Sequence, residues 1–185
     1  MPWIRSIPRS EADPELQDVY ERIAGERGKL SNIMAVQSLN PGAMDAHMDL
    51  YMRIMFGTGR LSREEREMIA VVDSSLNRCP YCVAHHEEAL RHYWKDEETL
   101  EQFRVGGEIP GLSDRQRALL DYARVLTSEP DSVAETHVEE LRAAGLEDAE
   151  ILSANLIVAY FNFVNRIALG LGVETSAEEV SGYKY

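Results

Sequence analysis

Signals that start α-helices recur along the whole chain of 185 residues, and they constrain the fold more than any other feature of the sequence. An Asp, Asn or Ser that precedes proline, or that is followed three residues later by Glu or Gln, is typical of a helix N-terminus. The clearest signals are Asp13-Pro14, Asn40-Pro41, Ser62 with Glu65, and Ser113 with Gln116. The sequence lacks alternating β-branched runs with hairpin turns. It therefore predicts an all-α fold.

The same signals, together with the spacing of apolar residues, predict about seven or eight helices. We expect them near residues 14–27, 41–57, 63–77, 80–94, 97–105, 114–128, 132–144 and 147–170. Because no low-complexity linker divides the chain and 185 residues can bury one good core, we predict a single helical-bundle domain over residues 1–185. We expect only the ends, residues 1–12 and 175–185, to be loosely held.

The last long helix is apolar on almost every side, from Ile151 to Leu171. Such a helix must be buried on several sides, either by a partner subunit or by a central place in the monomer core. The first reading predicts a homo-oligomer. Polar side chains on this helix need partners, because an unpaired buried amide costs on the order of 1–3 kcal/mol. They are Asn155, Asn162, Asn165 and Arg166, and they serve either helix packing or support of a redox site.

The formal net charge of −13 argues against a nucleic-acid partner, because binding a polyanion needs a basic stripe and the 19 Lys and Arg residues are scattered. The first residues, Met1 to Ser6, lack the apolar segment of a signal peptide. The longest uncharged stretch, Ile151 to Asn165, is too short to span a bilayer. We therefore expect a cytoplasmic protein with no membrane partner.

The two cysteines of the chain form the motif Cys79-Pro80-Tyr81-Cys82. On a helix, these thiols lie within one turn and His86 lies on the same face, so the thiols can form a disulfide or share a metal. Pro80 favours the first helical position, and this places the thiols in a first turn, where free amides and the helix dipole stabilise a thiolate. In the cytoplasm the motif indicates a redox pair rather than a structural disulfide.

Glu67 lies on the helix before the motif and borders its apolar side. A carboxylate beside an apolar face tends to hold its proton, and a raised pKa suits a general base that works near neutral pH. The capping box and the helix dipole explain Glu64 and Glu65, which lie in the first turn. From the residues alone, Glu67 is either a catalytic group or a solvated charge.

Methionines recur at helical spacing between residues 44 and 55. They are Met44, Met48, Met52 and Met55. Core packing explains such a stripe, and a pliant apolar wall for an organic substrate is the alternative, because methionine adapts to irregular shapes.

Glu67, Cys79, Cys82 and His86 together form the pattern E-x11-C-x2-C-x3-H. This pattern resembles the active-site signature of the alkyl hydroperoxidase D family within the carboxymuconolactone decarboxylase superfamily. The region from Leu61 to His86 is similar in particular to the branch called peroxidase-related proteins. Further matches to that branch are Ser31-Asn32-Ile33-Met34, Asn40-Pro41-Gly42 and the segment from Tyr160 to Arg166.

The resemblance implies an all-helical subunit that assembles into a trimer, hexamer or dimer and reduces hydroperoxides without a cofactor. Cys82 corresponds to the peroxidatic cysteine, Cys79 to the resolving cysteine, and Glu67 and His86 to the proton relay. An unidentified thiol or dithiol would then reduce the disulfide. Tyr81 stands where some members have histidine, which puts its share in the relay in doubt, and we expect His85 at the surface or outside direct contact with the substrate.

Three alternative functions remain open from the sequence alone. The tetrad Cys79-Pro80-Tyr81-Cys82 is typical of glutaredoxins, so disulfide exchange is the nearest competitor, and a β-strand leading into Cys79 would favour it. A zinc site formed by Cys79, Cys82, His86 and Glu67 is a second alternative. A non-redox or decarboxylating member of the superfamily is the third, although such relatives generally lack the cysteine pair.

Overall fold

The computed structural model describes residues 2–184, and within this range the chain forms helices and no β-strand. The α-helices are α1 (Pro14–Arg27), α2 (Asn32–Ala35), α3 (Pro41–Phe56), α4 (Arg63–Leu76), α5 (Pro80–Leu90), α6 (Glu97–Arg104), α7 (Asp114–Ser128), α8 (Glu135–Ala143), α9 (Asp148–Gly170) and α10 (Ala177–Val180). Two 3-10 turns, η1 (Arg9–Glu11) and η2 (Pro130–Ser132), accompany them. Among the described helices, all except α2 and α10 have eight residues or more. The all-α fold and the predicted number of helices are therefore confirmed.

The helix starts that the sequence predicted from capping residues are confirmed. The capping side chains are Asp13, Asn40, Ser62 and Ser113, and each accepts a hydrogen bond from the backbone amide three residues ahead. In addition, Ser62 and Ser113 form complete capping boxes. Because each cap satisfies an amide that the helix itself leaves unpaired, α1, α3, α4 and α7 begin at the predicted residues.

The other helix boundaries differ from the prediction for local reasons. α5 ends at Leu90 rather than near residue 94, because the amides of His92 and Tyr93 bond to carbonyls three residues back and tighten the chain into turns. α8 begins at Glu135 rather than at 132, because η2 precedes it. α2 and α10 have four residues each, which is too short for a periodic pattern to reveal them.

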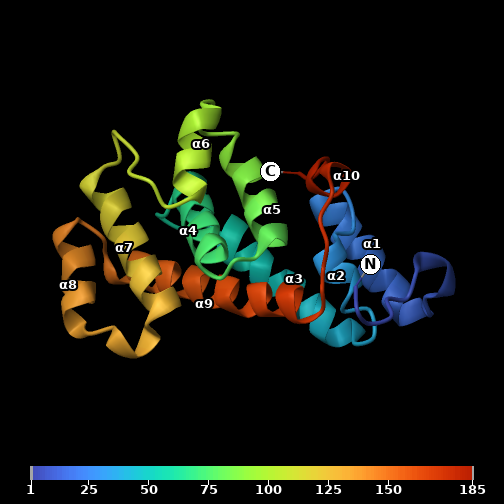
Figure 1. The fold of residues 1–185 in the computed structure, drawn as a ribbon. Coiled ribbons are helices and arrows are strands. Elements are labelled where there is room, and N and C mark those ends of the chain that lie inside the picture. Colours follow the sequence, from blue (N-terminus) through green and yellow to red (C-terminus); the bar gives the residue numbers. More distant parts are fainter. Residues whose placement is uncertain (1, 185) are drawn as a thin grey trace.

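α4 lies at the centre of the fold and packs against α5, α7 and α9. In Figure 1, α9 runs along one side of the molecule, with α7 and α8 at one end and α1 and α2 beyond the other. Met68 and Ile69 of α4 and Phe161 of α9 are buried in the shared hydrophobic core. Burying a side chain of this size contributes roughly 1.5–3 kcal/mol. This packing fixes the position of α4, the helix that carries Glu67.

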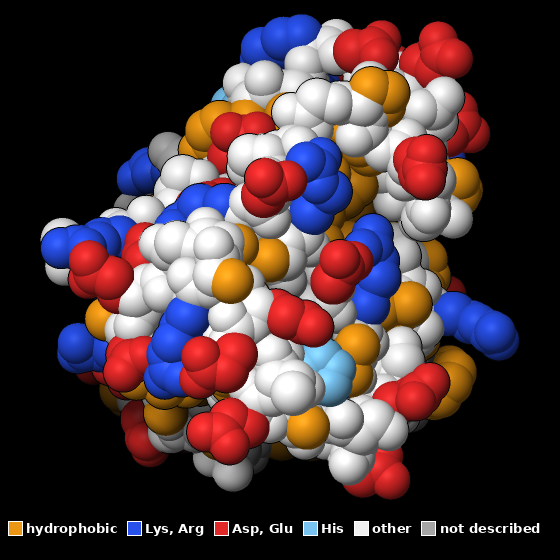
Figure 2. Space-filling model, turned by 90° about the vertical axis from the view of Figure 1, so that its left-hand side faces the viewer, with side chains coloured by type: hydrophobic (Ala, Val, Ile, Leu, Met, Phe, Trp, Pro, Cys, Tyr) orange, Lys and Arg blue, Asp and Glu red, His pale blue; other side chains and the backbone are white. Residues whose placement is uncertain are grey.

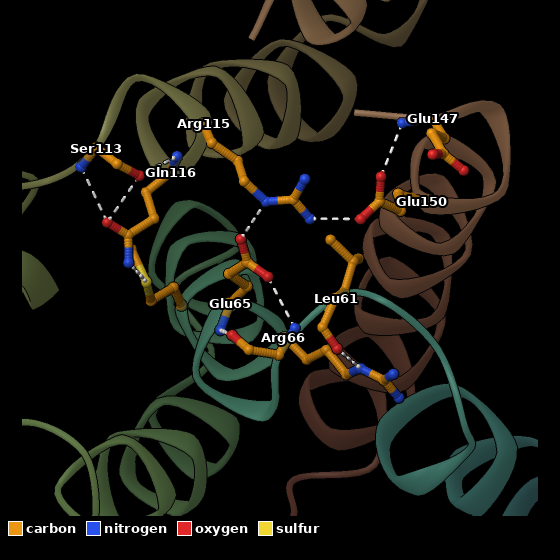
Figure 3. A network of polar contacts seen from close by, with 10 residues as sticks. Leu61, Glu65, Arg66, Ser113, Arg115, Gln116, Glu147 and Glu150 are labelled. Atoms are coloured by element: carbon orange, nitrogen blue, oxygen red, sulfur yellow. Dashed lines mark hydrogen bonds and ion pairs between the residues drawn. The ribbon is translucent and has the colours of Figure 1, made fainter. Parts of the chain in front are cut away.

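A polar network joins the first turns of α4, α7 and α9 (Figure 3). Arg115 of α7 donates to Oε1 of Glu65 at 2.7 Å and to Oε1 of Glu150 at 2.8 Å. Burial opposes the charge of Glu150, but the Glu147 amide and Arg115 lower the pKa of Glu150 below its usual value. The network fixes the N-terminal end of α4 against its two neighbours.

Charges of both signs share the surface of the molecule. On the face at the α7 and α8 end, Lys and Arg side chains are interspersed with Asp and Glu and form no continuous basic stripe (Figure 2). This face of the described residues therefore lacks the basic surface that a nucleic-acid binder needs.

One face of α9 is apolar and exposed. The side chains on it are Leu152 (59% exposed), Leu156 (43%) and Phe163 (49%). The opposite face is fully buried at Ile157 and Phe161. Among the described helices, α9 is the one that is long and apolar enough to cross a membrane, and half of its most apolar window is buried within the fold. The sequence left open whether a partner subunit or the monomer core covers this helix. The core covers one face of α9 and leaves the other face exposed.

We predict that a second copy of the chain covers the exposed face of α9, since oligomer interfaces are rich in such side chains. Light scattering at micromolar concentration should give a mass well above the 20.9 kDa of one chain. Leu156→Glu should lower this mass, because it places a charge in the interface. Val105→Glu is the control, since Val105 is 73% exposed at the C-cap of α6, a helix that lies apart from α9 in Figure 1. A wild-type mass equal to one chain contradicts the prediction.

Candidate active site

The turn between α4 and α5 places Cys79 at a helix N-terminus. Arg78 has φ 54°, the left-handed conformation that side chains other than glycine rarely adopt. This residue redirects the chain, so that Cys79 becomes the N-cap of α5 and Pro80 its first residue. A helix rather than a β-strand therefore leads into the motif, and the glutaredoxin arrangement is excluded.

The two thiols differ in environment although both are free and buried. A hydrogen bond from the Cys82 thiol lowers the pKa of Cys79 against the effect of burial, and the backbone amides of Cys82 and Tyr81 add to it. The same thiol contact, followed by burial, raises the pKa of Cys82 well above its usual value. The sequence predicted that the first turn stabilises a thiolate at both positions, whereas the structure provides this stabilisation at Cys79 alone. Cys82 must lose a proton before it can attack a substrate.

Glu67, His86 and Arg63 form a chain of charged contacts next to the cysteines. His86 Nδ1 lies 2.6 Å from Glu67 Oε2, and Arg63 forms an ion pair with Oε1 of the same carboxylate. Glu67 is fully buried, so the alternative of a solvated charge is wrong. Burial opposes its charge, yet His86 and Arg63 lower the pKa of Glu67 below its usual value. The raised pKa that the sequence predicted is therefore also wrong.

An ionised Glu67 determines which nitrogen of His86 is protonated. A carboxylate can only accept hydrogen bonds, so Nδ1 of His86 is the donor. The second nitrogen, Nε2, then has a free lone pair when the ring is neutral. His86 also lines the cavity that contains Cys82. In this arrangement Glu67 orients the His86 ring and leaves Nε2 able to accept a proton.

The polar residues of α9 divide into two groups. Asn155 Nδ2 donates a hydrogen bond to the Tyr122 hydroxyl at 2.8 Å, and Asn162 Nδ2 donates to Thr127 Oγ1 at 3.0 Å. These contacts match the alternative in which the polar residues of α9 fix helix packing. Asn165 is fully buried and bonds to Ser74 at 3.2 Å. It also hydrogen-bonds the Cys82 thiol, and this contact opposes the rise in the pKa of Cys82 that Cys79 and burial cause.

Arg166 differs from the buried asparagines of α9. It is exposed and bonds to Asn162, one turn back on the same helix. Of the four polar residues that the sequence singled out on this helix, Asn165 is therefore the one that reaches the cysteine site.

A cavity next to Cys82 has about 70 Å³ in which a water molecule can be centred. Since a buried water needs about 10–15 Å³ by this measure, the space suits a compact organic group. Its wall includes Met48, Cys82, His86, Tyr160 and Phe161. Met44, Met48 and Met55 are buried in the core. The methionine stripe therefore serves core packing, and Met48 in addition contributes to the cavity.

His85 lies in the same cavity, which corrects the expectation of a surface position. Its ring packs against Tyr81 in a tilted arrangement and against Tyr183 edge to face, with centroid distances of 4.4 and 5.3 Å. Burial, followed by the charges of His86, Lys29 and Arg27, lowers the pKa of His85 to about 3. His85 is therefore neutral at physiological pH. The Tyr81 hydroxyl donates to Glu179 at 2.7 Å, so it is held by the C-terminal segment rather than by His86.

Arg63 and Arg27 were missed by the sequence reasoning. Arg63 precedes Glu67 by four residues on α4, a spacing that places two side chains on the same helix face and could have revealed the ion pair. Arg27 is the last residue of α1 and lines the cavity with Cys82. Nothing in the sequence near Arg27 indicates this long-range contact.

The zinc alternative gains no support from the arrangement of the side chains. Within residues 2–184, no group of three or more His, Cys, Asp or Glu side chains is placed to hold a metal ion. Glu67 instead uses its two oxygens for His86 and Arg63.

A family model and several solved structures match this chain. The model of the carboxymuconolactone decarboxylase family matches residues 41–125, which include both cysteines, Glu67 and His86. A peroxidase-related protein of uncharacterised function from Silicibacter sp. TM1040 is 31% identical with a TM-score of 0.85, over 97% of this chain and 94% of that chain. The chain belongs to the carboxymuconolactone decarboxylase family.

Other solved structures share the fold of this family member. A peroxidase-related protein from Ralstonia eutropha JMP134, described as an alkylhydroperoxidase AhpD core, is 27% identical with a TM-score of 0.84, over 97% of this chain and 94% of that chain. The debrominase Bmp8 is 21% identical with a TM-score of 0.77, over 95% of this chain and 96% of that chain, and supports the fold alone. A search of curated proteins gave no match. The family and the alkyl hydroperoxidase D-like fold are thus both confirmed.

Proposed function

We propose that this protein is a thiol-dependent peroxidase that reduces organic hydroperoxides through Cys82 and Cys79. The observation that carries the proposal is the position of Cys82 in a cavity wall beside His86, whose Nδ1 is held by an ionised Glu67. A nucleophile, a base and a group that orients the base are thus present in one site. The family is enzymatic in general, and two of the similar solved structures are described as peroxidase-related.

In the first step, Nε2 of His86 takes the proton of Cys82. The resulting thiolate attacks the terminal oxygen of the hydroperoxide, so that a sulfur–oxygen bond forms and the O–O bond breaks. Cys82 becomes a sulfenic acid and the substrate leaves as an alkoxide. The proton held on His86 converts the alkoxide to an alcohol. Glu67 stabilises the imidazolium between these two proton transfers.

In the second step, the thiolate of Cys79 attacks the sulfenic sulfur of Cys82. A disulfide forms, and the sulfenic oxygen leaves as water after it takes up a proton. The lowered pKa of Cys79 suits this role, because it favours the thiolate form that resolves the sulfenic acid. An external thiol or dithiol small enough to enter the cavity then returns the disulfide to two thiols. We propose that this occurs in the cytoplasm, where such reductants are abundant.

Exchange with protein disulfides is disfavoured by the burial of the cysteines. Cys79 is fully buried and Cys82 is 3% exposed, so the disulfide of a folded protein cannot reach either sulfur. A small hydroperoxide can reach Cys82 through the cavity.

Thiol titration tests the proposal directly. The reduced protein should show two thiols per chain, and one equivalent of cumene hydroperoxide should remove both, because one attack followed by resolution consumes the pair. A sample kept without peroxide provides the control. If both thiols persist after the peroxide is added, the proposed function is wrong.

A further inference from the structure

The guanidinium of Arg27 is a buried positive charge that the proposed chemistry does not use. Arg27 is 7% exposed and lines the cavity that contains Cys82. Among residues 2–184, no carboxylate forms an ion pair with it, and its one hydrogen bond runs to the carbonyl of Lys184 at 2.5 Å. A guanidinium has five N–H donors, so most of them have no protein acceptor. Burying a charge without an anionic partner is costly, and a ligand anion would offset this cost.

The fold holds Arg27 in place from two sides. α1 ends at Arg27, and Gly28 at φ 91° turns the chain away in the left-handed conformation that glycine adopts without strain. The C-terminal segment returns beside α1 (Figure 1), and the amide of Lys184 donates to the Arg27 carbonyl at 3.0 Å. Arg27 is therefore positioned before any ligand arrives, which is what a recognition residue requires.

Aromatic rings rather than acids surround the guanidinium. Its central carbon lies 4.6 Å from the ring centroid of Phe56, 5.3 Å from that of Tyr51 and 5.6 Å from that of Tyr183. Cation–π contacts of this kind lower the cost of burial without occupying the N–H donors. The donors therefore stay available for a carboxylate, which accepts two parallel hydrogen bonds from a guanidinium.

The other charges around the cavity are balanced within the protein. Arg63 is paired with Glu67. Lys29 lies 3.7 Å from Glu179, which also accepts a hydrogen bond from Tyr81. Arg27 thus provides the uncompensated positive charge of the cavity, whereas the chain as a whole carries −13.

We infer that the cavity binds organic hydroperoxides that carry a carboxylate, with the carboxylate on Arg27 and the peroxide facing Cys82. This inference rests on the proposed function and names its substrate class. The rings of Tyr160 and Phe161 and the side chain of Met48 contact the compact apolar body between the two groups. The net charge of −13 repels anions in general, so a preference for the anion requires a local site.

A pair of peroxides that differ in charge and by one methyl group tests this inference. The reduced protein is mixed with 4-(2-hydroperoxypropan-2-yl)benzoate or with its methyl ester, and the rate of thiol loss is measured for each. The wild-type protein should react at least about tenfold faster with the carboxylate than with the ester, because the bound carboxylate forms a favourable ion pair. Arg27→Gln should bring the ratio of the two rates to about one or below, and Arg27→Lys should restore part of the preference.

Arg22→Gln is the matched control. Arg22 lies on α1 as well, but it pairs with Asp45 and Asp49 and does not line the cavity. Its replacement should leave the ratio of the two rates unchanged. Damage to the fold or to the C-terminal segment slows the reaction with both peroxides alike. A change in the ratio of the two rates therefore reports the loss of anion recognition. Equal rates in wild type, or an unchanged preference in Arg27→Gln, would overturn the inference.

A binding measurement separates this inference from the proposed function. The unreactive analogue 4-isopropylbenzoate should raise the melting temperature of wild type and not that of Arg27→Gln, whereas its methyl ester should not distinguish the two. If neither peroxide oxidises the thiols but the analogue binds through Arg27, the peroxidase proposal is wrong and the anion site stands. If the ester is reduced but the analogue does not bind, the proposed function stands and the carboxylate inference is overturned.

Discussion

Cys82→Ser should abolish the loss of thiols that an organic hydroperoxide causes. Cys82 contributes its side chain to the cavity wall, whereas Cys79 is fully buried and does not line the cavity. A serine hydroxyl does not become an effective nucleophile toward the O–O bond, so the remaining Cys79 thiol should persist after one equivalent of peroxide. Titration of the single remaining thiol measures this directly.

Cys79→Ser should give a different kind of defect. Cys82 can still attack once, but no thiolate is available to resolve the product, so a sulfenic acid should accumulate at Cys82. Dimedone should trap it, and mass spectrometry should place the adduct on Cys82. Cys82→Ser treated in the same way should show no adduct.

The opposite assignment has a physical basis, which is why both variants are needed. The pKa of Cys79 is lowered by its hydrogen bond from Cys82, while the pKa of Cys82 is raised, so Cys79 is the more ionised sulfur at rest. Attack by Cys79 would require the peroxide to reach a fully buried atom. Because the peroxide can reach Cys82 from the cavity and cannot reach Cys79, we assign the attack to Cys82 although Cys79 is the more ionised thiol. A dimedone adduct on Cys79 in the Cys82→Ser variant would reverse the assignment.

The sequence predicts the helices of this fold well because their ends are encoded locally. A capping serine and the Glu or Gln three residues later specify where α4 and α7 begin, whatever the rest of the chain does. The contacts of the chain ends are different. The Ile7 amide donates to Ser38 and the Lys184 amide to Arg27, across 31 and 157 residues of sequence. Nothing near residues 7 or 184 indicates such distant partners.

The candidate site shows the same division between local and distant information. Spacing on one helix predicts that Cys79, Cys82 and His86 share a face, and the family pattern adds Glu67. The protonation state of Glu67 was predicted incorrectly, because the sequence shows its apolar neighbours but not the approach of Arg63 and His86 in space. The contacts with these two side chains outweigh the effect of burial and lower the pKa of Glu67.

Glu67→Gln should slow the reaction of the thiols with hydroperoxide on the order of 10²-fold or more, the usual scale for disabling a general base. The amide oxygen of glutamine can still accept the Nδ1 proton of His86, so the imidazole should keep its orientation. A neutral amide does not stabilise the imidazolium that forms when His86 takes the Cys82 proton. The deficit should narrow as the pH rises from about 6 to about 9, because the fraction of Cys82 that ionises without help from His86 grows with pH, although its raised pKa keeps this fraction small.

The same substitution should also change the dependence of stability on pH. The folded-state pKa of Glu67 is lowered, so its charge adds stability above the ordinary carboxyl pKa, and this contribution is lost as the pH falls. Glu67→Gln should therefore lose less stability than wild type on acidification. At neutral pH it should be less stable by roughly 3 kcal/mol or less, because Arg63 loses its ion pair but is itself partly exposed.

Glu65→Gln is the matched control, since it makes the same change on the same helix two residues away. Glu65 is also buried and pairs with an arginine, Arg115, but it lies in the network that fixes α4 and outside the cavity. Glu65→Gln should lower the free energy of unfolding and leave the rate of thiol loss per folded molecule unchanged. If Glu65→Gln slowed the reaction as much as Glu67→Gln does, the effect of Glu67 would come from the stability of α4. A rate defect confined to Glu67→Gln, which narrows with rising pH, is what a proton relay through His86 requires.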